Sequence, residues 1–264
     1  MTASTSRSLF PFFALAVALS LPLWIAGASV GDLSDLLGID LPVSALTAFA
    51  PMAAALLLTV REQGGAAAWA LFLRAFDAHR VRNLAWIAVA ALLMPALMTL
   101  AYGLMRWGGT EIPPPVIAPT TVLVFAALFL AGAIGEELGW QGYAYPRLRS
   151  GRSALAAAVA LGLAWALWHV VSFMQTDHDA AWIFWQCLFT IAARVVTVWL
   201  YEASGESVFV AVLFHTMSNM AAFLFPVMGS HYDPALAFAL TAGVAVVATL
   251  LWGPAMLARF RRPP

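Results

Sequence analysis

The sequence predicts an all-α polytopic membrane protein, a bundle of about eight transmembrane helices, from its low charge and its repeated apolar runs. Of the 264 residues, 63% are hydrophobic and only 10% are charged, whereas a soluble domain carries about 25% charged residues. A surface that faces lipid needs no charge, so this deficit indicates a bilayer. Each apolar run of roughly 20 residues can cross a hydrocarbon core about 30 Å thick.

The apolar runs fill the chain, and no stretch between them is long enough for a separate soluble domain. We therefore expect one transmembrane domain over residues 1–264. The expected spans lie near 9–30, 42–60, 83–106, 119–146, 153–173, 180–202, 206–227 and 234–258. The first run follows Arg7 as in a signal peptide, but it exceeds the usual length of about 7–15 apolar residues. We interpret it as a retained helix.

The arginines predict the orientation of the chain. All thirteen basic residues are arginine. With the N-terminus in the cytoplasm, eleven fall on the inner side: Arg7, Arg61, Arg74, Arg80, Arg82, Arg147, Arg149, Arg152, Arg259, Arg261 and Arg262. Arg106 falls on the outer side and Arg194 within a helix. The positive-inside rule then predicts two cytoplasmic termini, and we expect the bacterial inner membrane. The stretch 61–82, apolar between arginines, is expected along the inner interface.

Two further observations limit the function. The single cysteine, Cys187, lies in an apolar helix, so we interpret it as a packing residue. It cannot form an internal disulfide, and a cysteine-based metal site is excluded. No basic face exists outside the loops, so no nucleic-acid partner is expected. The expected partners are the lipid bilayer and a membrane-embedded or lipid-modified protein or peptide.

Ionisable side chains inside the predicted spans are the functional candidates, because each is costly in a bilayer unless it is paired or solvated. They are Glu136, Glu137, His169, Arg194 and His215, with Asn219 as a polar neighbour. At about 1.5 Å per helical residue, Glu136 and His169 both lie about 24–26 Å from the turn between their helices. Arg194 and His215 are likewise expected at the same depth as each other in the membrane. We expect these residues to meet at one depth.

Helical spacing also predicts their directions. His215 and Asn219 are one turn apart and share a face. Glu136 and Glu137 are adjacent, about 100° apart around the helix, so only one can face the site. We expect Arg194 to pair with the other.

This set of side chains suits hydrolysis of a carbonyl compound such as a peptide bond. A glutamate beside a histidine can activate water, and a second histidine with an asparagine can donate hydrogen bonds to an oxyanion. Two histidines and a glutamate also match a catalytic zinc set, but no His-Glu-x-x-His helix is present. We expect no cofactor and keep zinc as the alternative.

Three motifs resemble those of the CPBP intramembrane endopeptidases, a family that contains the type II CAAX prenyl endopeptidases and bacteriocin-processing or immunity proteins. Residues 136–142 (Glu-Glu-Leu-Gly-Trp-Gln-Gly) resemble its first motif, 165–169 (Trp-Ala-Leu-Trp-His) its second, and 215–219 (His-Thr-Met-Ser-Asn) its third. The family core would cover about 119–227. The resemblance implies a glutamate-dependent, metal-free membrane protease.

The resemblance also implies roles for single residues. Glu136 and His169 would activate the water, and His215 and Asn219 would bind the oxyanion. The family's arginine is replaced here by Gln141, and its usual phenylalanine by Trp165, which keeps an aromatic wall.

The glutamine removes a positive charge near the glutamates. We hypothesise that Arg194, or Arg147 nearer the interface, supplies it instead. The alternative function is a non-catalytic family relative that acts as a bacteriocin-immunity or membrane scaffold protein. A transporter is less supported, because we find neither related halves nor helices broken at the midplane.

Overall fold

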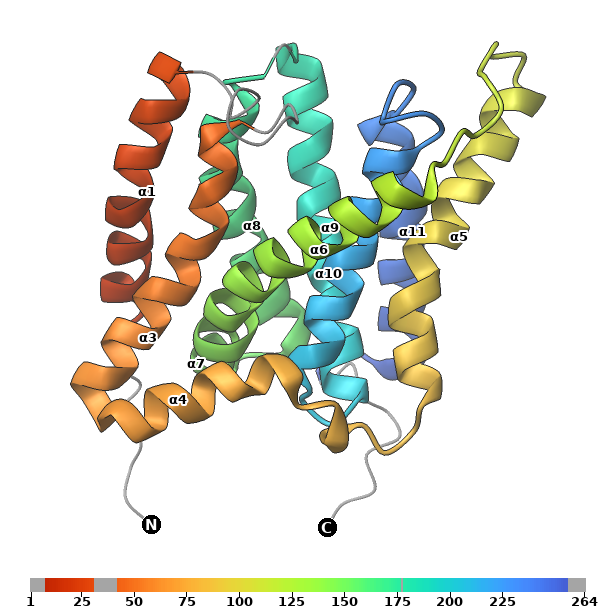
Figure 1. Ribbon diagram of the computed structural model, residues 1–264. Helices are drawn as coiled ribbons and strands as arrows, with labels where there is room; N and C mark the ends of the chain where they lie inside the picture. The colour runs from red at the N-terminus through yellow and green to blue at the C-terminus, as the bar shows by residue number, and fades with distance from the viewer. Residues whose placement is uncertain (1–7, 31–41, 177, 256–264) are drawn as a thin grey trace.

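The computed structural model describes residues 8–30, 42–176 and 178–255, which form a bundle of helices (Figure 1). In chain order, with η for the 3₁₀ and π segments, the elements are α1 (Phe10–Val30), η1 (Val43–Phe49), α3 (Ala50–Gln63), α4 (Gly65–Leu73), η2 (Arg74–Phe76), η3 (Ala78–Arg80), α5 (Ala85–Trp107), α6 (Pro119–Glu137), η4 (Leu138–Ala144), α7 (Tyr145–Arg149), α8 (Ala154–Phe173), α9 (Ala180–Ala203), α10 (Val208–Leu224) and α11 (Pro234–Trp252). No strand occurs in these ranges. The predicted all-α class is confirmed.

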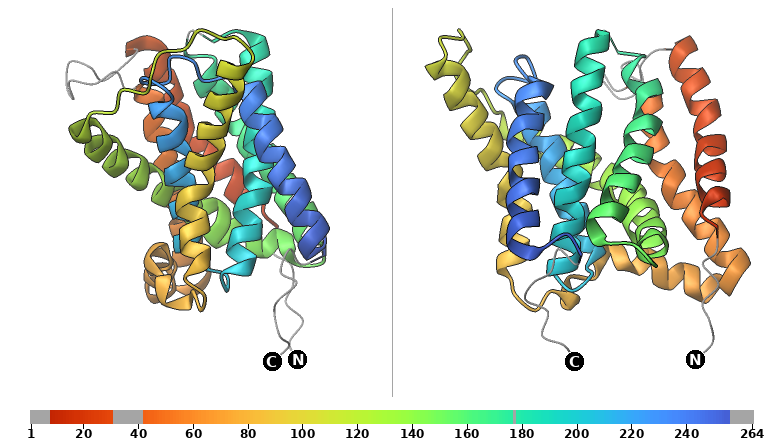
Figure 2. Two further views of the ribbon diagram at one scale, coloured as in Figure 1. Left: turned by 90° about the vertical axis from the view of Figure 1, so that its right-hand side faces the viewer. Right: turned by 180° about the vertical axis from the view of Figure 1, so that it is seen from behind.

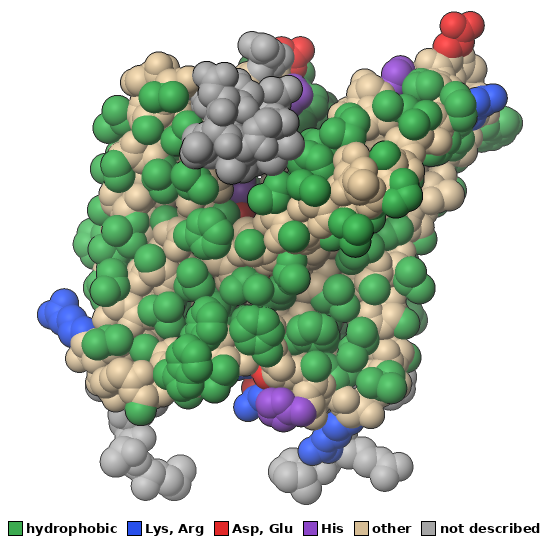
Figure 3. Space-filling model, in the orientation of Figure 1, with side chains coloured by type: hydrophobic (Ala, Val, Ile, Leu, Met, Phe, Trp, Pro, Cys, Tyr) green, Lys and Arg blue, Asp and Glu red, His purple; other side chains and the backbone are tan. Residues whose placement is uncertain are grey.

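Seven stretches of the described chain are long and apolar enough to cross a bilayer: Phe10–Val30, Val43–Gln63, Ala85–Trp107, Pro119–Arg149, Ala154–Phe173, Ala180–Ala203 and Pro234–Trp252. The expected span 206–227 corresponds to α10, which has only 17 residues. Helices of about 17–25 residues can span the hydrocarbon core, so α10 is at the lower limit. The protein is an integral membrane protein. Figure 3 shows apolar side chains over most of one face.

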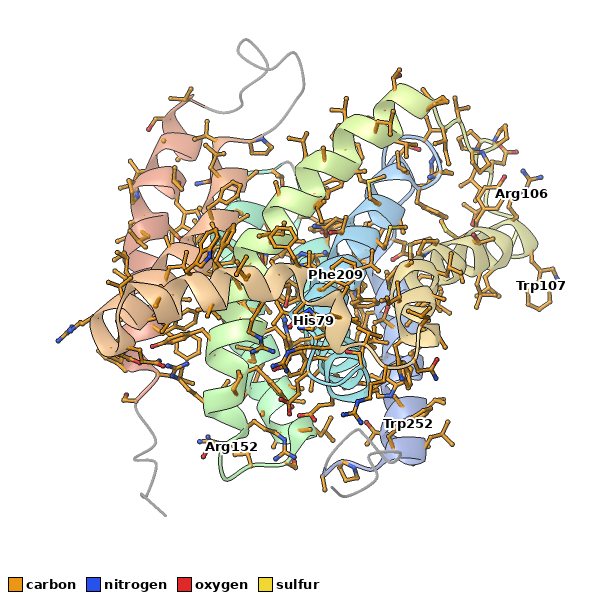
Figure 4. All side chains as sticks on the ribbon, turned by 60° about the horizontal axis from the view of Figure 1, so that its bottom comes forward. His79, Arg106, Trp107, Arg152, Phe209 and Trp252 are labelled. Atoms are coloured by element: carbon orange, nitrogen blue, oxygen red, sulfur yellow. The ribbon has the colours of Figure 1, made fainter. Side chains whose placement is uncertain are left out.

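The bundle has an arginine-rich end, which holds α4, η2, η3 and the turn from α7 to α8. Arg149 donates a hydrogen bond of 2.9 Å to the carbonyl of Ala255, so the end of α11 lies beside that turn. Ser8 lines a small surface pocket together with Arg152, which places the start of α1 at the same end. Figure 4, which looks toward this end, labels Arg152, whereas Arg106 lies at the far end of α5. The other end is called the arginine-poor end below.

The stretch 61–82 runs across the arginine-rich end, as the sequence indicated for an interfacial segment. Figure 1 shows α4 lying across the bundle, and both views of Figure 2 show it at the same end as the described ends of the chain. Its continuation is fixed by polar contacts. Arg74 donates to the hydroxyl of Tyr201 at 3.2 Å, and Asp77 accepts from Ser207 at 2.7 Å and from the backbone N–H of Phe209 at 3.1 Å.

Helix α6 and the η4 segment that follows it approach η1 and α3 so closely that only glycine fits at the contact. A Cβ added to Gly135 would lie 2.6 Å from the carbonyl oxygen of Ala48, and one added to Gly139 would lie 2.5 Å from the carbonyl carbon of Pro51. Small residues allow such backbone contacts between membrane helices. Figure 1 shows α6 tilted, so that it separates from α3 toward the arginine-poor end. The glycines therefore hold these segments together at one end of a cavity that η1 and α6 both line.

The first motif continues from α6 into a π-helix, η4, all of whose residues are buried. The sequence predicted an unbroken helix over 119–146. Instead, the N–H of Tyr145 donates to the carbonyl of Trp140, five residues earlier. Pro146 follows and has no N–H to continue regular α-helical bonding. π-Turns occur often at functional sites, and this one directly follows Glu137.

The glycine contact gives a stability prediction. We expect Gly139→Ala to lower the free energy of unfolding by about 1–3 kcal/mol, the usual cost of overpacking a tight site. The cause is the backbone of Pro51, which cannot yield as a flexible side chain would. Thermal unfolding in detergent measures the change. Gly243→Ala is the matched control, because Gly243 is also helical but a Cβ there meets nothing within 4 Å. Equal stability of the two variants would contradict the close contact.

Candidate active site

A cavity of about 850 Å³ lies between α6, α8, α9, α10 and η1. Three of the predicted site residues line it: Glu136, His169 and Asn219. Glu136 is 6% exposed, and Asn219 is half-buried. In the upper half of Figure 3, an acidic and a histidine side chain are visible at the bottom of a hollow. The fourth, fifth and seventh expected spans thus each supply a polar side chain to one space.

Glu136 and His169 face each other across the cavity wall, and Trp165 fixes both. The indole N–H of Trp165 donates to Oε2 of Glu136 at 2.5 Å. The carbonyl of Trp165 accepts from Nδ1 of His169 at 2.9 Å. Because a carbonyl can only accept, Nδ1 carries the proton and a neutral ring presents the Nε2 lone pair. That Nε2 is 3.8 Å from Oε2 of Glu136, which is too long for a direct hydrogen bond.

Glu137 points away from the cavity into a fully buried ion pair with Arg194. Both side chains are 0% exposed. The guanidinium donates from Nη1 at 2.6 Å and from Nη2 at 3.0 Å to the two carboxylate oxygens. This is the pair that the helical spacing predicted. The arginine also lies 4.1 Å from the ring centre of Trp165, a cation–π contact.

His215 is joined to the same carboxylate. Its Nδ1 donates to Oε1 of Glu137 at 2.9 Å. Its ring packs edge-on against Trp165 with 5.2 Å between ring centres. Arg194, Glu137 and His215 therefore form a continuous buried chain behind the wall that carries Glu136. Asn219 follows His215 by one turn of α10 and lies nearer the cavity.

The two departures from the family motifs have clear places in the structure. Gln141 is 0% exposed, and its Oε1 accepts from Nη1 of Arg194 at 3.5 Å. Arg147 instead pairs with Glu62 at 3.1 Å and stacks 3.5 Å over the ring of Tyr143. Of the two arginines considered from the sequence, only Arg194 therefore contacts a glutamate of the first motif.

Sequence reasoning missed much of the cavity wall. Pro42 to Phe49 form one side of it, although their only polar side chains, Ser44 and Thr47, gave no functional signal. Phe125, Phe129 and Phe223 form an aromatic cluster with ring centres 4.1–5.7 Å apart.

Tyr232 closes the wall by donating to Gln186 at 2.9 Å. Burial raises the pKa of the Tyr232 phenol above its ordinary value, so it stays a neutral donor. Phenylalanines and tyrosines of this kind look like ordinary lipid-facing or core residues in a sequence.

The zinc alternative finds no support in the geometry. Among the described residues, no group of three or more His, Cys, Asp or Glu side chains could hold a metal ion. Of the two glutamates of the first motif, Glu137 has both carboxylate oxygens bound by Arg194. Cys187 is free and half-buried, with its sulfur 3.9 Å from the carbonyl of Ala166.

Comparisons with known proteins agree with this arrangement. The family model described as "Type II CAAX prenyl endopeptidase Rce1-like" matches residues 118–221. The CAAX prenyl protease 2 of Methanococcus maripaludis (strain S2) is 26% identical over 211 residues, which cover 75% of this chain and 78% of the relative. The membrane bundle and these matches identify the chain as an intramembrane protease. Within that class, the chain is similar to the type II CAAX prenyl endopeptidase-like proteins.

The buried ion pair gives a second prediction. Arg194→Met leaves the carboxylate of Glu137 buried without its arginine partner, so we expect a loss of about 3–5 kcal/mol in the free energy of unfolding. Thermal or denaturant unfolding in detergent measures it. Adding Glu137→Gln to Arg194→Met removes the stranded charge and should restore most of the lost stability.

Arg106→Met is the control for this prediction, because Arg106 is exposed and its nearest polar partner is Tyr102. A surface change of this kind should alter stability by no more than about 0.5 kcal/mol. If the double variant were less stable than Arg194→Met alone, the ion pair would not be the source of the loss.

Proposed function

We propose that the protein hydrolyses a peptide bond of a membrane-associated protein or peptide with a water molecule activated by Glu136 and His169. The observation that carries this proposal is the placement of the two side chains in one cavity, with Nε2 3.8 Å from Oε2. Polar groups at that separation suit a water molecule that is hydrogen-bonded to both. The cavity has room for a substrate beside such a water.

The chemistry follows from the hydrogen bonds. Glu136 is held by the indole of Trp165 and can take a proton from the water, while the free Nε2 of His169 orients it. The hydroxide then attacks the carbonyl carbon of the scissile bond, and a negative charge forms on the carbonyl oxygen. Collapse of this intermediate breaks the C–N bond. The proton that Glu136 took from the water passes to the departing amine, which returns the carboxylate to its starting state.

His215 and Asn219 are proposed to bind the developing oxyanion. Asn219 lines the cavity and can donate through its amide. His215 already donates from Nδ1 to Glu137, so it can donate from Nε2 only when its ring carries both protons. The carboxylate of Glu137 is the adjacent counter-charge for that ring, and Arg194 holds the carboxylate in place. Glu137, Arg194 and Gln141 are thus proposed as positioning residues.

The aromatic wall supports an apolar substrate. Phe125, Phe129 and Phe223 line the cavity beside the site, and such surfaces bind apolar segments rather than charged ones. The relative from Methanococcus maripaludis is named a CAAX prenyl protease. We propose a membrane-embedded or lipid-modified protein or peptide as substrate, with the protein in a bacterial inner membrane and both termini in the cytoplasm.

The alternative of a non-catalytic immunity or scaffold protein depended on Gln141. In the structure, Arg194 provides a positive charge at Glu137, and Gln141 contacts that arginine. The replacement therefore does not leave Glu137 without a cationic partner. We favour the enzyme.

The first test of this function removes the groups that activate water. With purified protein in liposomes and a panel of apolar membrane peptides, Glu136→Gln and His169→Ala should each reduce cleavage by at least about 10²-fold, the usual contribution of acid–base groups. Glu111→Gln, an exposed residue outside the cavity, should cleave like wild type. A chelator should have no effect. Loss of activity on chelation would favour zinc, and equal cleavage by all variants would contradict the assignment.

The second test addresses the oxyanion. Asn219→Ala should lower kcat by about 10²–10³-fold, as loss of one oxyanion donor does elsewhere, with little change in KM. Asn83→Ala is the matched control, because Asn83 is exposed, lies outside the cavity and has its Oδ1 accepting from the N–H of Ala85. An increase in KM with unchanged kcat would instead make Asn219 a binding residue.

A further inference from the structure

The cavity opens toward the arginine-poor end. Its lining extends from Glu136 to the start of η1, the loop after α8, the start of α9 and the loop before α11. Residues there include Pro42, Thr176, Trp182 and Ser230. No lining residue belongs to the arginine-rich end, neither to 74–82 nor to 145–153 nor to 204–209. Figure 1 shows the ends of these helices and loops together at the top, opposite α4.

The depths of the site residues agree with this direction. His169 lies only four residues, about 6 Å, before the end of α8 at Phe173, but fifteen residues, about 22 Å, after its start. Asn219 lies five residues, about 8 Å, before the end of α10, and eleven residues, about 16 Å, after its start. Both side chains are therefore much nearer the arginine-poor surface than the arginine-rich one.

The arginine-rich end is closed beneath the site. The π-helix η4 is buried along its whole length. Below it, Tyr145 donates to Glu202 at 2.7 Å, and Arg74 donates to Tyr201 at 3.2 Å. These contacts fill the route that a substrate from this end would need.

We propose that the substrate is an apolar segment of a membrane-inserted protein or peptide in the extracytoplasmic half of the bilayer. The positive-inside rule assigns the arginine-rich end to the cytoplasm, so the cavity faces the opposite side. This inference rests on the proposed function and adds the side from which the peptide bond is presented. A cytoplasmic tail anchored in the inner leaflet would have to pass the closed end to reach Glu136.

The direction of the opening can be tested without a substrate. In a Cys187→Ala background, Ser230→Cys marks the cavity mouth and Ser150→Cys marks the arginine-rich end; both side chains are exposed. In intact cells, a membrane-impermeant maleimide should label Ser230→Cys, and should label Ser150→Cys only after the membrane is opened. The reverse pattern would overturn the proposal.

The side of cleavage is tested with two reporter substrates. Each has one transmembrane segment and the same apolar peptide, placed at its extracytoplasmic end in one reporter and at its cytoplasmic end in the other. Co-expressed wild type should cleave the first at least tenfold faster, and Glu136→Gln should cleave neither. A bulky impermeant maleimide on Ser230→Cys should block cleavage, whereas the same reagent applied to Ser150→Cys in opened membranes should not.

The outcomes separate the two proposals. Faster cleavage of the cytoplasmic reporter overturns the direction of access while the protease function stands. If a panel of peptide sequences gives no cleavage of either reporter, the proposed catalytic function fails, and the labelling pattern still decides which side the cavity faces.

Discussion

The buried ion pair between Arg194 and Glu137 is the constraint on which the rest of the site depends. Neither charge can exist alone in a dry helix interior, because transferring an unpaired ion from water is very costly. Their bidentate contact fixes α9 against α6 at one rotation. That rotation places the adjacent Glu136 on the cavity side, since neighbouring helical residues point about 100° apart. One charge pair thus decides which glutamate is accessible to a substrate.

Small residues also fix the position of α6, in addition to the charge pair. Gly135 of α6 and Gly139 of η4 bring the backbone against Ala48 and Pro51. Gly162 does the same between α8 and α9, where an added Cβ would lie 3.1 Å from Ile191. Contacts of this kind replace the hydrophobic driving force that lipid does not supply between membrane helices. These glycine contacts hold α6 against η1 and α3 only near its C-terminal end, and the tilt of α6 leaves room for the cavity farther along the helix.

Much of this could be predicted from the sequence, for identifiable reasons. Long apolar runs predict spans because bilayer thickness fixes helix length, and the pairing of Arg194 with one glutamate followed from helical periodicity. The π-helix could not be predicted, because Gly142 and Pro146 are equally compatible with a simple helix end. The walls from Pro42 to Phe49 and from Phe125 to Phe129 were also missed, since apolar side chains that line a cavity have the same composition as those that face lipid. The roles of the site residues remain proposals that the geometry supports.

Trp165 makes two hydrogen bonds that hold Glu136 and His169. Its side chain holds the carboxylate of Glu136, and its main chain holds the ring of His169. The two groups of the proposed acid–base pair are therefore both held by one residue. A phenylalanine at this position would keep the main-chain anchor and lose the indole donor, so the glutamate would gain rotational freedom while the histidine kept its tautomer. The distance between the two groups therefore depends on one residue of α8 and on its hydrogen bond to Glu136 of α6.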